Sequence, residues 1–277
     1  MLARELAPEC LLSGDPAAVL EDLDDKQITI ERIRFLMGRG GALALAAERW
    51  ERAGIWVLSR GHPQYPARLK KRLGGKSPSL LFGVGDRSHL NRGGIAIVGS
   101  RNATGPQLEL AGQLGARAAN EGVSIISGGA RGVDEAAMLG ALEFGGVAIG
   151  VLADSLMRAS TSKKYRSFLA SGQATLVSPF NPEAGFDVGN AMARNKYVYC
   201  LSDCAVVVAT AKGSGGTWAG ATESLKHGWV PVWVETSTDP KSGSGQLREL
   251  GARALPGLDQ SDLVGTLTTT TVSSPTT

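Results

Sequence analysis

Three short segments place glycines beside hydroxyl or cationic side chains directly after runs of apolar residues. They are "GSR" (99–101), "SGGARGVD" (127–134) and "AKGSGGTWAGATE" (211–223). Glycines let the backbone N–H groups approach an anion closely, and Ser, Thr or Arg side chains complete the hydrogen bonds to its oxygens. The three segments therefore predict phosphate binding.

A fourth segment, "NAMARNKYVYCLSD", combines cations, an amide and aromatic rings within about two helical turns. Arg194 and Lys196 flank Asn195, and Tyr197 and Tyr199 follow. Cations pair with phosphates and aromatic rings stack on bases, which suits a sugar-phosphate chain. A solvated helix start followed by two core tyrosines explains the same residues equally well, so both interpretations stay open.

The common phosphate and hydrolase motifs do not occur. The pattern GxxxxGK[ST] is missing, and Gly99 does not begin a GxGxxG motif, which argues against a kinase, a GTPase or an NAD dehydrogenase. The three histidines lie outside the glycine-rich segments, and no catalytic constellation is evident, so we expect neither an enzyme nor a bound cofactor. Cys200 and Cys204 have no further ligand nearby in sequence, and we expect buried side chains rather than a metal site.

The elements that must position these segments alternate between strands and helices from residue 94 onward. The predicted strands are short, continuous apolar runs: "IAIV" (95–98), "VSIIS" (123–127), "VAIGVL" (147–152), "ATLVS" (174–178), "AVVVAT" (205–210) and "VPVWVE" (230–235). Continuous rather than alternating hydrophobicity indicates strands covered on both faces. We predict an α/β fold with an extended Rossmann-like, doubly wound and mostly parallel sheet, and ligands in such sheets bind beyond the carboxyl ends of the strands.

Three regions are expected along the chain. Residues 1–52 form a small helical region with segments at 15–23 and 29–54, in which Asp15 caps the first helix. Residues 53–262 form the Rossmann-like domain. Residues 263–277, rich in Thr and Ser, form a disordered tail.

The composition permits a nucleic-acid partner without requiring one. The 277 residues carry a formal net charge of +3, with 43% hydrophobic and 20% charged residues. No apolar run approaches the length of a membrane span, and the first residues lack a signal-peptide pattern, so we expect a cytoplasmic protein without a membrane partner.

In order along the chain, the motifs resemble those of the DNA-processing protein A family, also called DprA or Smf. The matching segments are "GIWVLSRGHPQYPARLKKRLGGKSPSLLFGVGD", "GIAIVGSRNATG", "SIISGGARGVDEAAMLGALEFGGVAIGVL" and "MARNKYVYCLSDCAVVVATAKGSGGTWAGATESLKHGWVPVWV". Together they cover about Gly54 to Glu235. The Thr-rich tail stands where the family carries a winged-helix domain, so the chain looks like a divergent member.

The resemblance implies a bacterial protein that binds single-stranded DNA and, during transformation, helps to load the RecA recombinase onto it. A defence-related role beside a neighbouring partner protein is also open, as is a homodimer. Asp134 is expected to cap its helix or to hold Arg101 or Arg131 in place. The remaining residues that the resemblance implies for DNA or phosphate binding are Gly99, Ser100, Arg101, Ser127, Gly128, Gly129, Arg131, Gly132, Arg194, Asn195, Lys196, Ser214, Gly215 and Thr217.

Two alternatives remain. The resemblance also places the chain in a wider superfamily that includes phosphoribohydrolases of the LOG type, so an enzyme or a sensor that acts on a nucleotide is the first alternative. In those enzymes a Glu follows the Thr of PGGxGTxxE by three residues, whereas here the first acid after Thr217 is Glu223. That displacement argues against hydrolysis but leaves a nucleotide sensor open. The other alternative is that the glycines only make tight strand-to-helix turns. This alternative does not explain why cations and hydroxyl groups recur at the strand ends.

Overall fold

The structure is a computed structural model that describes residues 8–21 and 28–268. The chain divides into two compact units, Met1–Arg52 and Ala53–Thr277, and each is considered by itself. Among the described residues, no helix combines the length and the apolar character that crossing a bilayer requires.

The first unit is helical. Its elements are η2 (Pro8–Leu11), α1 (Pro16–Val19), α2 (Ile30–Met37) and α3 (Gly40–Arg52). Asp15 caps α1 as predicted, because its carboxylate accepts a hydrogen bond from the backbone N–H of Ala17. The single helix expected over 29–54 is wrong: glycines at 38, 40 and 41 lower helix propensity there, and α2 and α3 are separate.

The second unit is built on one sheet of nine strands. Their order across the sheet is β1-β2-β6-β5-β4-β3-β7-β8-β9, and all neighbouring pairs from β6 to β9 are parallel, whereas β1 and β2 run antiparallel at one edge. The mostly parallel, Rossmann-like sheet predicted from the apolar runs is confirmed. The strands are β1 (Trp56–Ser59), β2 (Leu80–Gly85), β3 (Ile95–Gly99), β4 (Ile125–Ser127), β5 (Ala148–Val151), β6 (Ala174–Ser178), β7 (Cys204–Val208), β8 (Val232–Val234) and β9 (Arg253–Ala254).

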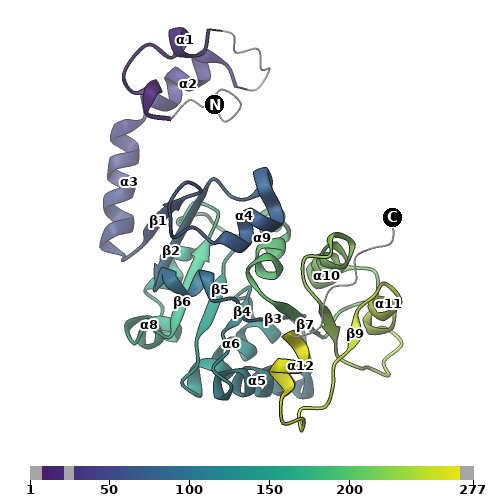
Figure 1. Cartoon of the computed structure of the whole chain (residues 1–277). Helices are drawn as coiled ribbons and strands as arrows, with labels where there is room; N and C mark the ends of the chain where they lie inside the picture. Colours follow the sequence, from purple (N-terminus) through teal and green to yellow (C-terminus); the bar gives the residue numbers. More distant parts are fainter. Residues whose placement is uncertain (1–7, 22–27, 269–277) are drawn as a thin grey trace. The chain divides into compact units, whose positions relative to one another are not determined.

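Helices cover both faces of the central strands. In Figure 1, α5 and α6 lie on one face of the sheet, and α4 and α9 lie on the other. The helices and 3-10 turns of this unit are α4 (Ala67–Leu73), η3 (Gly74–Lys76), η4 (Arg87–Asn91), α5 (Gly105–Asn120), α6 (Val133–Glu143), α7 (Leu156–Ser160), α8 (Lys163–Ala170), α9 (Val188–Leu201), α10 (Gly215–His227), α11 (Ser244–Glu249) and α12 (Leu263–Thr268).

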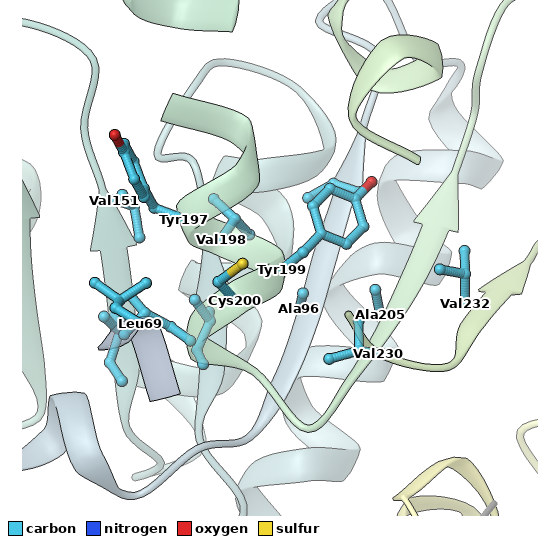
Figure 2. Packing of buried hydrophobic residues seen from close by; sticks show 14 of the residues in the cluster. Leu69, Ala96, Val151, Tyr197, Val198, Tyr199, Cys200, Ala205, Val230 and Val232 are labelled. Atoms are coloured by element: carbon cyan, nitrogen blue, oxygen red, sulfur yellow. The ribbon is translucent and has the colours of Figure 1, made fainter. Parts of the chain in front are cut away.

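The core explains why the central strands are continuous apolar runs. Every residue of β5, β6 and β7 is buried, because each of these strands has helices on both faces. Figure 2 shows the second half of α9 packed over the strands, with Val198 and Cys200 directed into the cluster that also holds Leu69 of α4. Burial of this apolar surface fixes the orientation of α9 above the sheet.

The tail predicted to be disordered from residue 263 is partly ordered. Leu263, Val264 and Leu267 are buried in α12, and the indole N–H of Trp233 donates to the carbonyl of Leu267 at 3.2 Å. These apolar residues find a partner surface, which outweighs the weak helix propensity of their Gly and Thr neighbours. The rest of the predicted tail, residues 269–277, lies outside the described residues.

Candidate nucleic-acid interface

The order in which successive strands are added to the sheet reverses at its centre, between β3 and β7. β3 is followed by β4 on one side, whereas β7, its other neighbour, is followed by β8 on the opposite side. The loops after β3 and β7 therefore diverge and leave a crevice at the carboxyl ends of these strands, which is where open α/β sheets bind their ligands.

A cavity of about 380 Å³ occupies this crevice, and we call it the switch-point cavity. Most of its lining comes from residues 98–101, 186–199 and 209–217, which follow β3, β6 and β7. It therefore brings together residues from all three predicted glycine-rich segments, the second through Ala130 and Asp134, and one side of α9.

A second cavity of about 500 Å³ lies beside the first, over the ends of β4 and β5, and we call it the basic cavity. Four cations that are exposed at the surface line it: Arg101, Arg131, Arg158 and Lys164. Lys164 also pairs with Glu135, and Arg131 donates to the side-chain oxygen of Asn102 at 3.3 Å. Positive charge therefore gathers on this part of the sheet edge although the chain as a whole is only mildly basic.

A buried ion pair lies where the two cavities meet. Arg194 of α9 lines both cavities, and its guanidinium is 3.8 Å from the carboxylate of Asp134, the second residue of α6. Each residue is only 5% exposed. Burial raises the pKa of Asp134 and lowers that of Arg194, and the charge of each opposes the shift in the other.

The buried pair leaves hydrogen-bonding capacity unused. Nε of Arg194 and the hydroxyl of Tyr199 are both buried and have no hydrogen-bond partner among the described residues. Burial raises the pKa of Tyr199, so its hydroxyl stays a protonated donor. Buried donors without partners are rare in folded proteins, and here both residues line the switch-point cavity.

Glycine is required at two positions for the loops to pack around this pair. A Cβ atom on Gly128 would lie 1.5 Å from Nη1 of Arg194, so the bare backbone makes room for the guanidinium. Gly132 has φ +95°, and a Cβ there would lie 2.4 Å from the carbonyl oxygen of Ser100. These two glycines serve close packing, and the packing places Arg194 between the cavities.

Backbone strain occurs at the same edge. In the part of the chain that the structure describes, two residues other than glycine have a positive φ: Ser155 at 51° and Ala209 at 61°. Ser155 lines the basic cavity and Ala209 lines the switch-point cavity. Such strain concentrates at functional sites.

An aromatic ring stands at the rim that the two cavities share. Phe186 is 57% exposed in the loop after β6, and the guanidinium of Arg101 lies 5.1 Å from its ring centroid. Both residues line both cavities. An exposed ring beside a cation offers one surface for a base and one charge for a phosphate.

The structure divides the predicted residues between the cavities. Gly99, Ser100, Asn195, Ser214, Gly215, Thr217 and Asp134 line the switch-point cavity; Gly128, Gly129 and Arg131 line the basic cavity; Arg101 and Arg194 line both. Gly132, Ser127 and Lys196 line neither.

Four expectations need correction. The hydroxyl of Ser127 is buried and donates to the carbonyl of Ile97 within the sheet, so it does not face a ligand. The side chain of Arg194 is buried at the base of the cavities rather than displayed at the surface, and it, not Arg101 or Arg131, is the ion-pair partner of Asp134. Lys196 lies over the ring of Tyr197, away from both cavities.

The two tyrosines of α9 belong to the core. Tyr197 is 8% exposed and Tyr199 is 1% exposed, so neither ring presents a face to a base. Figure 2 shows them leaving opposite sides of the helix. This decides between the two interpretations that the sequence left open for these rings.

Sequence reasoning did not single out Arg158 and Phe186. Both follow predicted strands, since Arg158 lies beyond the end of β5 and Phe186 beyond the end of β6. Both residues could have been identified as candidates from the rule that ligands bind at the carboxyl ends of parallel strands.

The placement of acidic side chains bears on the metal and hydrolysis alternatives. The described residues contain no cluster of three or more His, Cys, Asp or Glu side chains that could hold a metal ion. Glu223 is exposed on α10 and does not line the switch-point cavity, where Asp134 is the one carboxylate among the described lining residues.

Comparison with known proteins gives a consistent result. The model of the DNA recombination-mediator protein A family matches residues 56–267. The DNA processing protein DprA of Bacillus subtilis (strain 168) is 30% identical over 217 residues, which are 76% of this chain and 71% of that protein. A putative DprA of Mycobacterium tuberculosis (strain H37Rv) is 29% identical over 199 residues, 68% of this chain and 49% of that protein.

Two solved structures share the fold. DprA of Streptococcus pneumoniae superposes with a TM-score of 0.63 and 24% identity, over 72% of this chain and 70% of that one. DNA processing protein A of Helicobacter pylori, whose structure was described for its single-stranded DNA binding mode, superposes with a TM-score of 0.64 and 24% identity, over 77% of this chain and 95% of that one.

Proposed function

The chain belongs to the DNA recombination-mediator protein A (DprA) family, and from that premise we propose that it binds single-stranded DNA across the basic cavity. In this proposal the sugar-phosphate backbone follows Arg131, Arg158 and Lys164, and Arg101 with Phe186 forms the adjoining rim. The proposed DNA site leaves out Ser214, Gly215 and Thr217, which line the other cavity.

The gathering of cations beside an exposed aromatic ring carries the proposal. Four exposed cations line one cavity of about 500 Å³, in which Asp154 is the one acid among the described lining residues, and this excess of positive charge attracts phosphates. Phe186 adds a π-face on which an unpaired base can stack. A duplex keeps its bases paired and stacked on each other, so it can use the cations but not the ring.

The cellular role that we propose is processing of single-stranded DNA for recombination in the bacterial cytoplasm. The curated relatives are called DNA processing proteins, which supports this class of role. Loading of a RecA-like recombinase, as in transformation, is the partner function that the family resemblance favours. A defence-related partner and a homodimer remain alternatives for the same DNA-binding surface.

Competition between two oligonucleotides tests the proposal. We expect a fluorescently labelled oligo(dT) strand to bind and to be displaced by unlabelled single strands at lower concentrations than by a blunt duplex of equal length. Fluorescence anisotropy measures both. Equal displacement by the duplex would show that only the charges act and that the ring does not.

Replacing Phe186 with alanine tests the stacking contact separately. We expect a loss of about 1 to 3 kcal/mol in binding of single strands, the usual range for one stacked base, and little change for duplex. The dependence of affinity on salt should stay as in the wild type, because no charge is removed.

Phe144 provides the matched control. It is 60% exposed and lies at the opposite end of α6 from the cavities, so Phe144→Ala removes a similar exposed ring without touching the proposed site. The stacking contact is refuted if both variants lose the same affinity, since that result points to a general effect of removing surface aromatic rings.

A further inference from the structure

We propose that the switch-point cavity binds a free nucleoside monophosphate, and that the bound nucleotide lowers the affinity of the basic cavity for DNA. The first half stands on the cavity alone, and the second half rests on the proposed DNA-binding function. The two cavities would then be separate sites coupled through shared side chains.

The lining of the switch-point cavity is apolar on one side and polar on the other. Val98, Val188 and Met192 provide an apolar wall, and Ser214 and Thr217 stand at the start of α10. A flat base fits against the apolar wall, and a phosphate fits at the start of α10. A volume of about 380 Å³ lies in the range of small-molecule sites.

The start of α10 attracts an anion. This helix has 13 residues, and its N-cap residue, Ser214, makes no side-chain hydrogen bond to the first turn. The first N–H groups of a helix have no partners within the helix, and its dipole places partial positive charge there. A phosphate on these groups would satisfy them.

The unpartnered donors are an independent sign of a ligand. The hydroxyl of Tyr199 and Nε of Arg194 are buried, lack partners among the described residues and belong to side chains that line this cavity. In a closed core they would be a net loss of free energy. Accepting groups on a nucleotide, such as phosphate or sugar oxygens, would complete them.

The charge of the lining favours one phosphate over three. Arg101 and Arg194 contribute two positive charges and Asp134 one negative charge, which leaves a single net positive charge for the ligand. A nucleoside monophosphate comes closest to balancing that charge, and a triphosphate would bring more negative charge than the cavity neutralises.

The shared side chains couple the two sites. Arg101, Arg194 and Phe186 line both cavities. A nucleotide that engages Arg101 in the switch-point cavity withdraws it from DNA in the basic cavity. Because binding linkage is reciprocal, DNA must lower the affinity for the nucleotide by the same factor.

Calorimetric titration of the full chain with AMP, GMP and dTMP tests the first half. We expect at least one of them to bind, and inorganic phosphate to bind far more weakly. Tyr199→Phe should keep the melting temperature, because the lost hydroxyl has no partner, and should weaken nucleotide binding by about tenfold. A purely structural tyrosine would show no such loss of ligand affinity.

Two alanines allow each cavity to be filled separately. Ala191 of α9 lines only the switch-point cavity, and Ala159 of α7 lines only the basic cavity; both are partly buried. We expect Ala191→Leu to abolish nucleotide binding while DNA affinity stays within about twofold of the wild type. Ala159→Leu should instead weaken DNA binding and leave nucleotide binding unchanged. In the wild type, a saturating concentration of the nucleotide should weaken DNA binding at least about fivefold.

Two results overturn the inference while leaving the DNA-binding proposal intact. If none of the three nucleotides binds the folded wild type, the cavity is not a mononucleotide site. If Ala191→Leu weakens DNA binding as strongly as Ala159→Leu, the switch-point cavity belongs to the DNA site and holds a nucleotide of the strand. If the wild type binds a nucleotide but does not bind single-stranded DNA, the proposed function is refuted instead.

Discussion

Arg101→Ala is expected to weaken binding of single-stranded DNA by about 1 to 3 kcal/mol, the range of a lost charge-assisted contact. Arg101 is exposed, lies at the junction of both cavities and is held in place by the ring of Phe186. Among the described residues it forms no ion pair that would neutralise it. The charge of Arg101 is therefore available to the ligand, and we expect Arg101→Ala to leave the stability of the fold almost unchanged.

Anisotropy titration with labelled oligo(dT) measures the loss, and thermal unfolding confirms that the variant is folded. Arg248→Ala is the matched control, since this exposed arginine lies at the end of α11 and lines neither cavity. The site assignment is wrong if both variants bind DNA equally well, because the overall charge of the protein, and not the position of Arg101, would then explain the binding.

Asp134→Leu is expected to lower the free energy of unfolding by about 3 kcal/mol, because it leaves the guanidinium of Arg194 buried without its counter-charge. Each side chain is only 7% exposed, so water cannot take over the role of the missing partner. Chemical denaturation monitored by tryptophan fluorescence measures the change.

The double variant Asp134→Leu/Arg194→Met separates stability from function. A buried ion pair replaced by apolar side chains of similar size often leaves stability unchanged or improves it. We therefore expect the double variant to regain most of the stability lost in Asp134→Leu but to bind DNA more weakly than the wild type. Full DNA affinity in a stable double variant would show that the pair serves the fold alone.

The central strands were predictable because each of them is a short apolar run in the sequence, whereas β9, Arg253–Ala254, has no such run. The runs 95–98, 174–178 and 205–210 correspond to β3, β6 and β7 within one or two residues at each end. Their continuity indicates burial on both faces, as in a parallel sheet covered by helices. The position of the glycine-rich segments at strand ends then placed them at one edge.

The orientation of side chains on α9 was not predictable. The sequence "RNKYVY" places cations and aromatic rings next to each other, but helical neighbours point in different directions. Packing of Val198 and Cys200 against the sheet sets the rotation of the helix, which turns Arg194 inward and Lys196 away. Only tertiary contacts carry that information.

The division of the edge into two cavities also depends on tertiary structure. Arg158 lies in α7 and Phe186 in the loop after β6, so both are outside the three predicted glycine-rich segments. Similarly, the apolar residues of α12 are few and surrounded by Gly and Thr, so their burial depends on a surface supplied by distant residues such as Trp233.

The dependence of DNA affinity on salt tests the central claim most directly. If the four cations of the basic cavity contact one DNA strand, the logarithm of the binding constant for oligo(dT) falls linearly with the logarithm of the salt concentration, with a slope of about −3. The affinity then falls by about 50-fold between about 50 and about 200 mM salt. Anisotropy titrations across that range measure it. Binding that is absent at low salt, or that does not change with salt, would contradict the assignment of the basic cavity as a site for the backbone of single-stranded DNA.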